Sequence, residues 1–395
     1  MIKALAGNLQ CPIDLNSTKT LVAAIYISII GPAVFIVQPG FVQGLVEYYH
    51  FTEQQAGYIA SAEMWGIAIT TLVMILLTGR VNWRYIMIWS VLLVVVGNLL
   101  STTTKSFVSF AALRCITGIG SGVLVSLTFT IIGLSANPDR NFGYMIMWIL
   151  LYGALGFLAM PTAYALVGMD GVLVFFALFT LSALPFVRHL PSSGEDHGVV
   201  DAEAVNLTRG YRVMAVATML VYFLAQGAVW AYLFLIGVSG GGSEQEVSNG
   251  LTLSQFGGVA GAFTAATLGI RWGRIFPLMA AVTGSIVSLT LLFAEMNVLL
   301  YAIAVCVFNY AWNLAHPFLL AAMASFDGSG KLVVYGVAGQ MLGLAIGPAL
   351  AASVIMKDNY SSVIWLGMTL FALSLLLILP PLMQQKKKVG RTENG

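Results

Sequence analysis

Residues 54–78 read QQAGYIASAEMWGIAITTLVMILLT, and Glu63 is the single charged side chain in this stretch. An α-helix needs about 20 apolar residues to cross the hydrocarbon core of a bilayer, so the stretch predicts a membrane span. A transmembrane barrel would show short segments of alternating hydrophobicity, whereas this run is continuously apolar. The stretch therefore predicts an α-helical membrane protein.

Charged residues are also scarce in the rest of the chain. Of its 395 residues, 59% are hydrophobic and 9% are charged, which excludes a water-soluble globular enzyme because soluble domains carry about 25% charged residues. Long uncharged runs predict an all-α polytopic membrane protein with twelve transmembrane helices. The expected spans are 20–41, 54–78, 83–101, 106–134, 142–167, 171–189, 211–237, 252–270, 275–294, 298–325, 331–356 and 360–383.

Lys and Arg residues set the expected orientation, because short cytoplasmic loops are enriched in them. If both termini are cytoplasmic, only Lys105 and Lys357 among the loop cations lie outside. We therefore expect a protein of the cell inner (cytoplasmic) membrane with both termini in the cytoplasm.

A polar, acidic segment from Leu190 to Arg209 separates the first six predicted spans from the last six. It lacks apolar periodicity, which is typical of a linker. The sequence predicts an N-terminal six-helix bundle at 1–189, a cytoplasmic linker at 190–210 and a C-terminal six-helix bundle at 211–395.

Short basic loops follow the second and the eighth predicted span. Arg80 and Arg84 in the first loop are matched by Arg271 and Arg274, with Gly273 between them, in the second. The two loops are offset by about 190 residues, which indicates an internal repeat. The two bundles are therefore expected to be pseudo-symmetric.

The fourth predicted span carries the most specific motif, R-x-x-x-G-x-G, as Arg114, Gly118 and Gly120. Together with the six-plus-six spans, the polar middle segment and the basic loops, it resembles the major facilitator superfamily over essentially the whole chain. The resemblance implies alternating access of two bundles around a midplane site, and the drug:proton antiporters of that family share the fourth-span motif. It also implies that the first, fourth, seventh and tenth spans line a central cavity. The gating loops implied by the resemblance contain Arg80, Arg84, Arg271, Gly273 and Arg274.

Glu63 and Arg114 are the charged residues that lie deep within predicted spans. A lone charge at the centre of a membrane helix costs about 2.5–3.5 kcal/mol on insertion scales, so such groups usually pair or face a water-filled cavity. The second and fourth spans are neighbours in the resembled fold, which makes a Glu63–Arg114 pair plausible. In a mobile pair Glu63 exchanges protons as its surroundings change, whereas a static pair only tethers two helices.

A polar stripe marks the tenth predicted span. Asn309, Asn313 and His316 are spaced i, i+4 and i+7, which puts them on one helix face. We expect this face to line the cavity, with His316 as a further candidate for proton coupling because imidazole titrates near neutral pH. The alternative interpretation is hydrogen bonding between helices.

Aromatic residues recur at helical spacing in the seventh span, as Tyr222, Gln226 and Trp230, and in the fifth, as Trp148 and Tyr152. Aromatic faces suit flat or amphipathic ligands and cations, although Trp and Tyr also anchor helix ends at the membrane interface. The candidate substrate-binding residues are Tyr26, Arg114, Trp148, Tyr152, Tyr222, Gln226, Trp230, Asn309, Trp312, Asn313, His316 and Gln340.

Other chemistry has little support in the sequence. There is no nucleotide-binding loop, and neither the three cysteines nor any other residues have metal-site spacing, so we expect no cofactor, no metal and no enzyme. A net charge of +2 gives no argument for nucleic acid. The expected partners are a small organic solute, protons and the lipid bilayer, and we expect a monomer.

Two directions of transport remain open from these residues. Glu63 with aromatic neighbours favours a proton-coupled exporter of amphipathic or aromatic compounds, and Arg114 with the same neighbours suits a proton-coupled importer of a small organic anion. A non-transporting membrane sensor or a membrane-embedded enzyme is the alternative from a different class.

Cysteine labelling tests the predicted topology. A Ser193→Cys variant should react with a membrane-impermeant maleimide only after cell lysis, because the positive-inside rule places the segment Leu190–Arg209 in the cytoplasm. Ser243→Cys, in a loop expected outside, is the control that should react in intact cells. Labelling of Ser193→Cys from outside intact cells would reverse the topology.

Overall fold

The computed structural model describes residues 14–193, 206–268, 273–293, 297–327, 331–356 and 359–392. In these ranges every regular element is an α-helix, apart from an isolated bridge between Met356 and Asn359. The helices are α2 (Thr18–Ile30), α3 (Ala33–Ile36), α4 (Gln38–Glu47), α5 (Glu53–Leu77), α6 (Trp83–Ser101), α7 (Phe107–Gly133), α8 (Pro138–Leu181), α9 (Leu184–Val187), α10 (Arg209–Ser239), α11 (Glu244–Leu268), α12 (Ile275–Leu291), α13 (Val298–Ser325), α14 (Lys331–Val354) and α15 (Ser361–Thr392). The predicted all-α class is confirmed.

The chain divides into two units, Met1–His197 (unit 1) and Gly198–Gly395 (unit 2). The bundles predicted at 1–189 and 211–395 therefore fall one in each unit. Most of the predicted linker at 190–210 lies outside the described residues.

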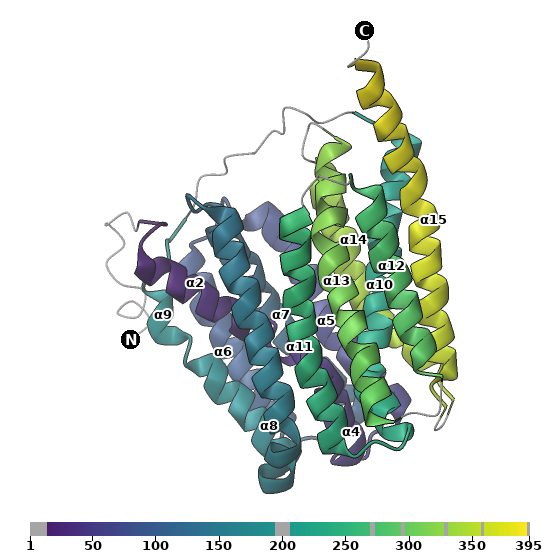
Figure 1. Cartoon of the computed structure of the whole chain (residues 1–395). Coiled ribbons are helices and arrows are strands. Elements are labelled where there is room, and N and C mark those ends of the chain that lie inside the picture. The colour runs from purple at the N-terminus through teal and green to yellow at the C-terminus, as the bar shows by residue number, and fades with distance from the viewer. Residues whose placement is uncertain are drawn as a thin grey trace. The chain divides into compact units, whose positions relative to one another are not determined.

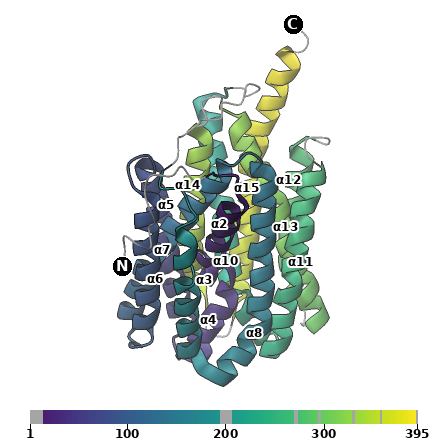
Figure 2. The same cartoon turned by 90° about the vertical axis from the view of Figure 1, so that its left-hand side faces the viewer.

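Eight helices in the described ranges are long and apolar enough to cross a membrane. One of them, α8, holds the fifth and sixth expected spans, because the chain turns back at Gly168 with φ 62° and ψ −171°. The stacking of Tyr152 on Phe179, with ring centroids 5.4 Å apart, shows that the two arms of α8 run alongside each other (Figure 2). Glycine is the residue that adopts such a positive φ without strain.

The first expected span, 20–41, is not one continuous helix. It is divided into α2, α3 and α4, with Pro32 before α3 and Pro39 in the first turn of α4. Proline has no N–H to donate within a helix, and its ring clashes with the preceding turn, so each proline interrupts the hydrogen-bond ladder. The span expected at 20–41 is therefore formed by three consecutive helices.

The eighth expected span, 252–270, begins earlier than expected, at Glu244 in α11. Ser243 N donates to Glu246 Oε2 at 2.9 Å, and Glu246 N donates to Ser243 Oγ at 3.3 Å, which together form a capping box. With α8 counted as two spans, α2–α4, α11 and the short apolar helix α12 complete the twelve.

The same helix pairs recur in the two units. In unit 1, α5 packs along α7, which also contacts α6 (Figure 2). In unit 2, α11 packs along α13, which also contacts α12 (Figure 1). The second and fourth spans of each half are thus partners, as a pseudo-symmetric repeat requires.

Two glycines of the fourth-span motif allow α7 to approach its neighbours closely. A Cβ atom at Gly118 would meet the backbone carbonyl oxygen of Glu63 on α5. A Cβ atom at Gly120 would lie 2.8 Å from the carbonyl oxygen of Ser90 on α6. Small residues permit such backbone approach in membrane bundles, so the motif brings α5, α6 and α7 together around Arg114.

Two glycines of the eleventh span, Gly343 and Gly347 in α14, have a similar packing role. A Cβ atom at Gly347 would lie 2.6 Å from the backbone nitrogen of Ala228, and one at Gly343 would lie 2.7 Å from that of Leu224. Both contacts are with α10, so Gly343 and Gly347 form the surface through which α14 and α10 meet.

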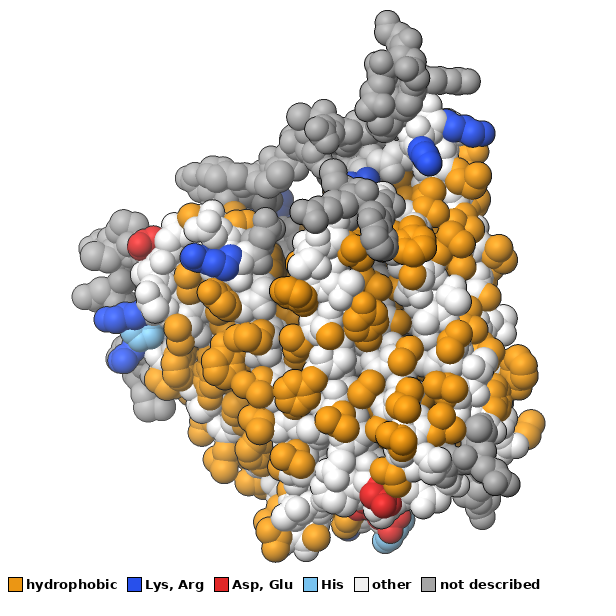
Figure 3. All heavy atoms as spheres, in the orientation of Figure 1, with side chains coloured by type: hydrophobic (Ala, Val, Ile, Leu, Met, Phe, Trp, Pro, Cys, Tyr) orange, Lys and Arg blue, Asp and Glu red, His pale blue; other side chains and the backbone are white. Residues whose placement is uncertain are grey.

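Large apolar side chains remain on the helix surfaces. Leu76 is 75% exposed and Leu166 is 78% exposed. On the face drawn in Figure 3 hydrophobic side chains cover most of the helices, while Lys and Arg side chains gather near helix ends. An apolar surface of this extent is suited to contact with lipid hydrocarbon.

The packing role of Gly118 leads to a stability prediction. Gly118→Ala should lower stability by about 1–3 kcal/mol, because its methyl group has no space beside α5. Gly143→Ala, in the exposed part of α8 where a Cβ meets nothing within 4 Å, is the matched control. The control should be neutral or stabilising, by up to about 1 kcal/mol, because alanine favours helix. Apparent melting temperatures in detergent measure both, and an unchanged Gly118→Ala protein would contradict the close packing.

Candidate functional site: a buried carboxylate and guanidinium

Glu63 on α5 and Arg114 on α7 face each other inside unit 1. Arg114 Nη1 lies 4.0 Å from Glu63 Oε1. The Arg114 side chain is fully buried, and that of Glu63 is 7% exposed. The structure thus brings together the two charges that the sequence singled out.

The hydrogen bonds of Arg114 go to α6 rather than to Glu63. Arg114 Nη1 donates to Asn98 Oδ1 at 2.9 Å, and Nη2 donates to Ser101 Oγ at 2.7 Å and to the Gly97 carbonyl oxygen at 3.2 Å. Arg114 Nε has no hydrogen-bond partner among the described residues. The guanidinium is therefore held on α6, and at 4.0 Å the Glu63 carboxylate accepts no hydrogen bond from it.

Asn98 and Ser101 were missed by the sequence reasoning. Both lie in the third span, 83–101, which was predicted only as an apolar helix. Their spacing of three residues puts them on one helix face, and this was the available signal. It was weak, because polar residues with no charge occur in many membrane helices.

The polar stripe of α13 divides between two neighbouring helices in unit 2. Asn309 Nδ2 donates to Ser254 Oγ on α11 at 3.3 Å, and Asn313 Nδ2 donates to Asn309 Oδ1 at 2.9 Å. His316 Nε2 instead lies 3.1 Å from Gln340 Oε1 on α14. Asn309 therefore links α13 to α11, Asn313 is bonded to Asn309 within α13, and His316 links α13 to α14.

The aromatic candidates of unit 2 also form two groups. Trp230 on α10 and Trp312 on α13 meet edge to face, with ring centroids 5.6 Å apart. Tyr222 and Gln226 are fully buried, and Gln226 Nε2 donates to the Tyr222 hydroxyl at 3.0 Å. The Tyr222 ring packs on Phe371 of α15.

The remaining candidates in unit 1 lie apart from Glu63 and Arg114. The Tyr26 hydroxyl is 2.6 Å from Ser182 Oγ, and Trp148 is 47% exposed. Tyr152 lines an apolar cavity of about 200 Å³ between the two arms of α8. These residues do not form one site with the charged pair.

Comparison with known proteins identifies the family. The sequence model of the Major Facilitator Superfamily matches residues 23–324. The chain belongs to this superfamily. The membership confirms the resemblance seen in the sequence, and it points to a membrane transporter rather than to an enzyme class.

Two relatives show how far the similarity extends. The protein YbcL of Bacillus subtilis (strain 168), described as an uncharacterized MFS-type transporter, is 23% identical over 367 residues, which cover 89% of this chain and 92% of YbcL. The crystal structure of a D-xylose-proton symporter aligns with a TM-score of 0.73 at 15% identity, covering 91% of this chain and 97% of the symporter. The second similarity shows the superfamily fold over nearly the whole chain.

The described arginines of the two basic loops of this superfamily member lie in different local positions. Arg80 is exposed, but Arg84 is buried in the first turn of α6, where its Nε donates to the Leu190 carbonyl oxygen at 2.5 Å. In the second loop Gly273 has a φ of 66°, and Arg274 is the N-cap of α12. Arg271 lies outside the described residues.

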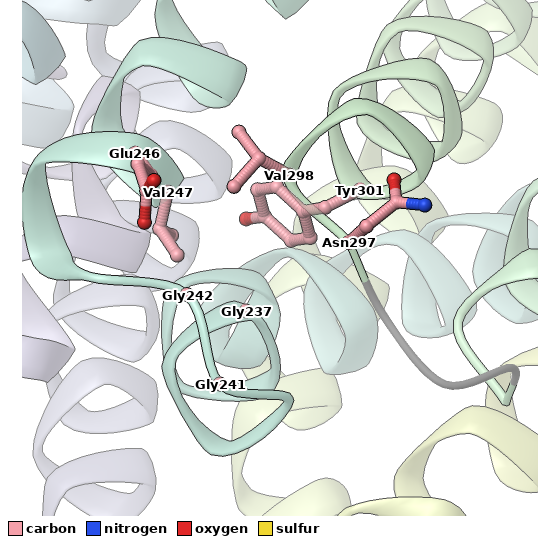
Figure 4. A pocket seen from close by; sticks show the side chains of 8 residues that line it. All are labelled: Gly237, Gly241, Gly242, Glu246, Val247, Asn297, Val298 and Tyr301. Carbon is pink, nitrogen blue, oxygen red and sulfur yellow. The ribbon is translucent and has the colours of Figure 1, made fainter.

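A separate pocket of about 220 Å³ lies at one end of unit 2, between α10, α11 and α13 (Figure 4). Its polar groups are engaged locally. Tyr301 donates to the Leu233 carbonyl oxygen at 2.9 Å, and Glu246 belongs to the capping box of α11. None of the predicted site residues lines this pocket.

The described residues also offer no metal site. No group of three or more His, Cys, Asp or Glu side chains in these ranges is arranged to hold an ion. Cys115 and Cys306, which lie in different units, are free thiols.

Proposed function

We propose that the protein is a proton-coupled secondary active transporter of a small organic solute, working by alternating access with Glu63 as the group that carries the proton. The observation that supports this proposal is the buried Glu63 carboxyl, 4.0 Å from an Arg114 whose Nη1 and Nη2 donate to α6. The proposal includes a monomer in the cytoplasmic membrane with both termini in the cytoplasm.

The geometry supports two states of the pair. A buried carboxylate is costly unless it is hydrogen-bonded to a partner, and protonation removes the charge. We propose that Glu63 carries a proton in the arrangement with Arg114 bonded to α6, since no donor among the described residues is then within hydrogen-bonding distance of a charged carboxylate. When Arg114 leaves its acceptors on α6 and approaches Glu63, the pair forms and the proton is released. Exchange between these arrangements gives one site for loading and unloading a proton.

The burial and the hydrogen bonds of Arg114 favour export of the solute over import. Its side chain is fully buried and donates to Asn98, Ser101 and Gly97, so it serves better to tune Glu63 than to bind an organic anion directly. We therefore favour export of amphipathic or aromatic compounds, with the edge-to-face pair of Trp230 and Trp312 as an aromatic surface for such solutes.

Import of a small organic anion is the second candidate. Arg114 Nε, buried and without a partner among the described residues, is a donor that a carboxylate could satisfy. Proton symport is the activity named for the D-xylose-proton symporter, which has the same fold. His316, beside Gln340, is the further candidate for a proton-carrying group.

Replacing Glu63 tests the proton coupling. Glu63→Gln in proteoliposomes should lose transport driven by a pH gradient but still allow exchange, because the amide keeps the shape of the side chain and cannot titrate. The transported probes are ethidium, a flat aromatic cation, and benzoate, a small aromatic anion. Glu47→Gln, which changes an exposed carboxylate at the end of α4, is the matched control and should transport as wild type does. If Glu63→Gln keeps full transport driven by the pH gradient, Glu63 does not carry the proton and His316 becomes the candidate.

The variant Arg114→Lys distinguishes the export proposal from the import proposal. Lysine keeps the charge but lacks the planar fork that binds a carboxylate through two hydrogen bonds, so an importer should bind benzoate about tenfold more weakly or worse. An exporter should keep its affinity for ethidium and change mainly the pH dependence of transport, because a nearby positive charge still acts on Glu63. A variant equal to wild type in both measurements would leave Arg114 as a tether between helices.

A further inference from the structure

Tyr49 is a buried residue in the short segment between α4 and α5. It contacts two exposed charged residues, Asp170 and Lys105. Its hydroxyl donates a hydrogen bond to Asp170 Oδ1, close to the Gly168 turn of α8. Lys105 Nζ, from the loop between α6 and α7, lies 5.1 Å from the centre of the Tyr49 ring. That distance is within the range of a cation–π interaction. Tyr49 therefore fastens the end of the first span to the turn of α8.

A column of aromatic rings connects Tyr49 to Arg114. The Tyr49 ring meets Phe110 of α7 edge to face at 5.7 Å, and Phe51 packs against both rings. The guanidinium carbon of Arg114, one helical turn along α7 from Phe110, lies 5.7 Å from the centre of the Phe110 ring. The rings of Tyr49, Phe51 and Phe110 thus contact one another, with Lys105 over the Tyr49 ring and Arg114 over the Phe110 ring.

Both positive and negative side chains lie next to the column of Tyr49, Phe51 and Phe110. Lys105 and Arg114 face the rings as cations, Asp170 faces the Tyr49 hydroxyl as an anion, and Glu63 lies beyond Arg114. Burial and the Asp170 carboxylate both raise the pKa of the Tyr49 phenol above its usual value. Tyr49 is therefore a neutral donor throughout the pH range in which a carboxyl group titrates.

We propose that Tyr49 is a positioning residue for the Glu63–Arg114 pair, because its hydrogen bond to Asp170 fixes the ring column that holds Arg114 against α6. When the first span separates from the turn of α8 during transport, this bond breaks and the column loosens. Arg114 is then free to approach Glu63, so opening at this end of unit 1 is linked to release of the proton. This inference rests on the proposed role of Glu63.

An infrared titration tests the link without a known substrate. The band of the protonated Glu63 carboxyl is the one that Glu63→Gln removes from spectra of the purified full chain across a pH series. Tyr49→Phe keeps the ring and removes the hydroxyl, and it should shift the midpoint of this band by about 0.5 pH unit or more. Tyr48→Phe is the matched control, because Tyr48 precedes Tyr49 in the chain but stacks on Tyr164 of α8 at 4.9 Å, and it should leave the midpoint unchanged.

A double-mutant cycle tests the contact itself. Tyr49→Phe and Arg114→Lys are combined, and the apparent melting temperatures of the four proteins in detergent are compared. Effects that do not add are expected, because the two residues act through the same column, whereas Tyr48→Phe with Arg114→Lys should be additive. Additive effects of Tyr49→Phe and Arg114→Lys would overturn the inference.

The two experiments fail separately. If no band is lost in Glu63→Gln, the proposed role of Glu63 fails, while a non-additive cycle still assigns Tyr49 to the positioning of Arg114. If the Glu63 band titrates with the same midpoint in Tyr49→Phe as in wild type, the inference fails and the role of Glu63 stands.

Discussion

The guanidinium of Arg114 has to be solvated by protein inside a bundle of apolar helices, and much of unit 1 is arranged around that requirement. An unpaired charge at this depth is costly, so acceptors must replace water. Asn98, Ser101 and the Gly97 carbonyl supply them from α6, and the Gly118 and Gly120 contacts allow α5 and α6 to come close enough to surround the side chain. The fourth-span motif therefore combines a charge with the glycines that make its burial possible.

Because the hydrogen bonds of Arg114 go to α6, Glu63 is neither tightly paired with a cation nor far from one. The carboxyl is buried beside a cation, yet its partner's hydrogen bonds go elsewhere. A tight, bidentate pair would be a stable tether, and a carboxyl far from any cation would remain protonated under most conditions. A separation of 4.0 Å lies between these extremes, and this intermediate arrangement is the one that the proposed exchange of a proton at Glu63 requires.

The sequence predicted the helices and the charged pair because both are signalled by composition. Glu63 and Arg114 stand out in runs that contain no other charge. Asn98 and Ser101 do not, since their polarity is ordinary and their importance depends on which helix α6 touches. Likewise, i, i+4 and i+7 spacing placed Asn309 and His316 on one face, but the packing of α13 between α11 and α14 gave them different partners. Spacing defines the face of a helix, whereas tertiary packing decides what each residue on it contacts.

The Gly168 turn has a mechanical consequence for the hairpin that it closes. The two arms of α8 are joined through one non-helical residue, so there is almost no loop to absorb relative movement at that end. Because the arms also stack on each other through Tyr152 and Phe179, a displacement of one arm is expected to move the other and Asp170, which lies two residues beyond the turn. A longer connection would dissipate such a displacement in loop flexibility. Through the hydrogen bond between Asp170 and Tyr49, the short turn thus connects movement of the hairpin to the end of the first span.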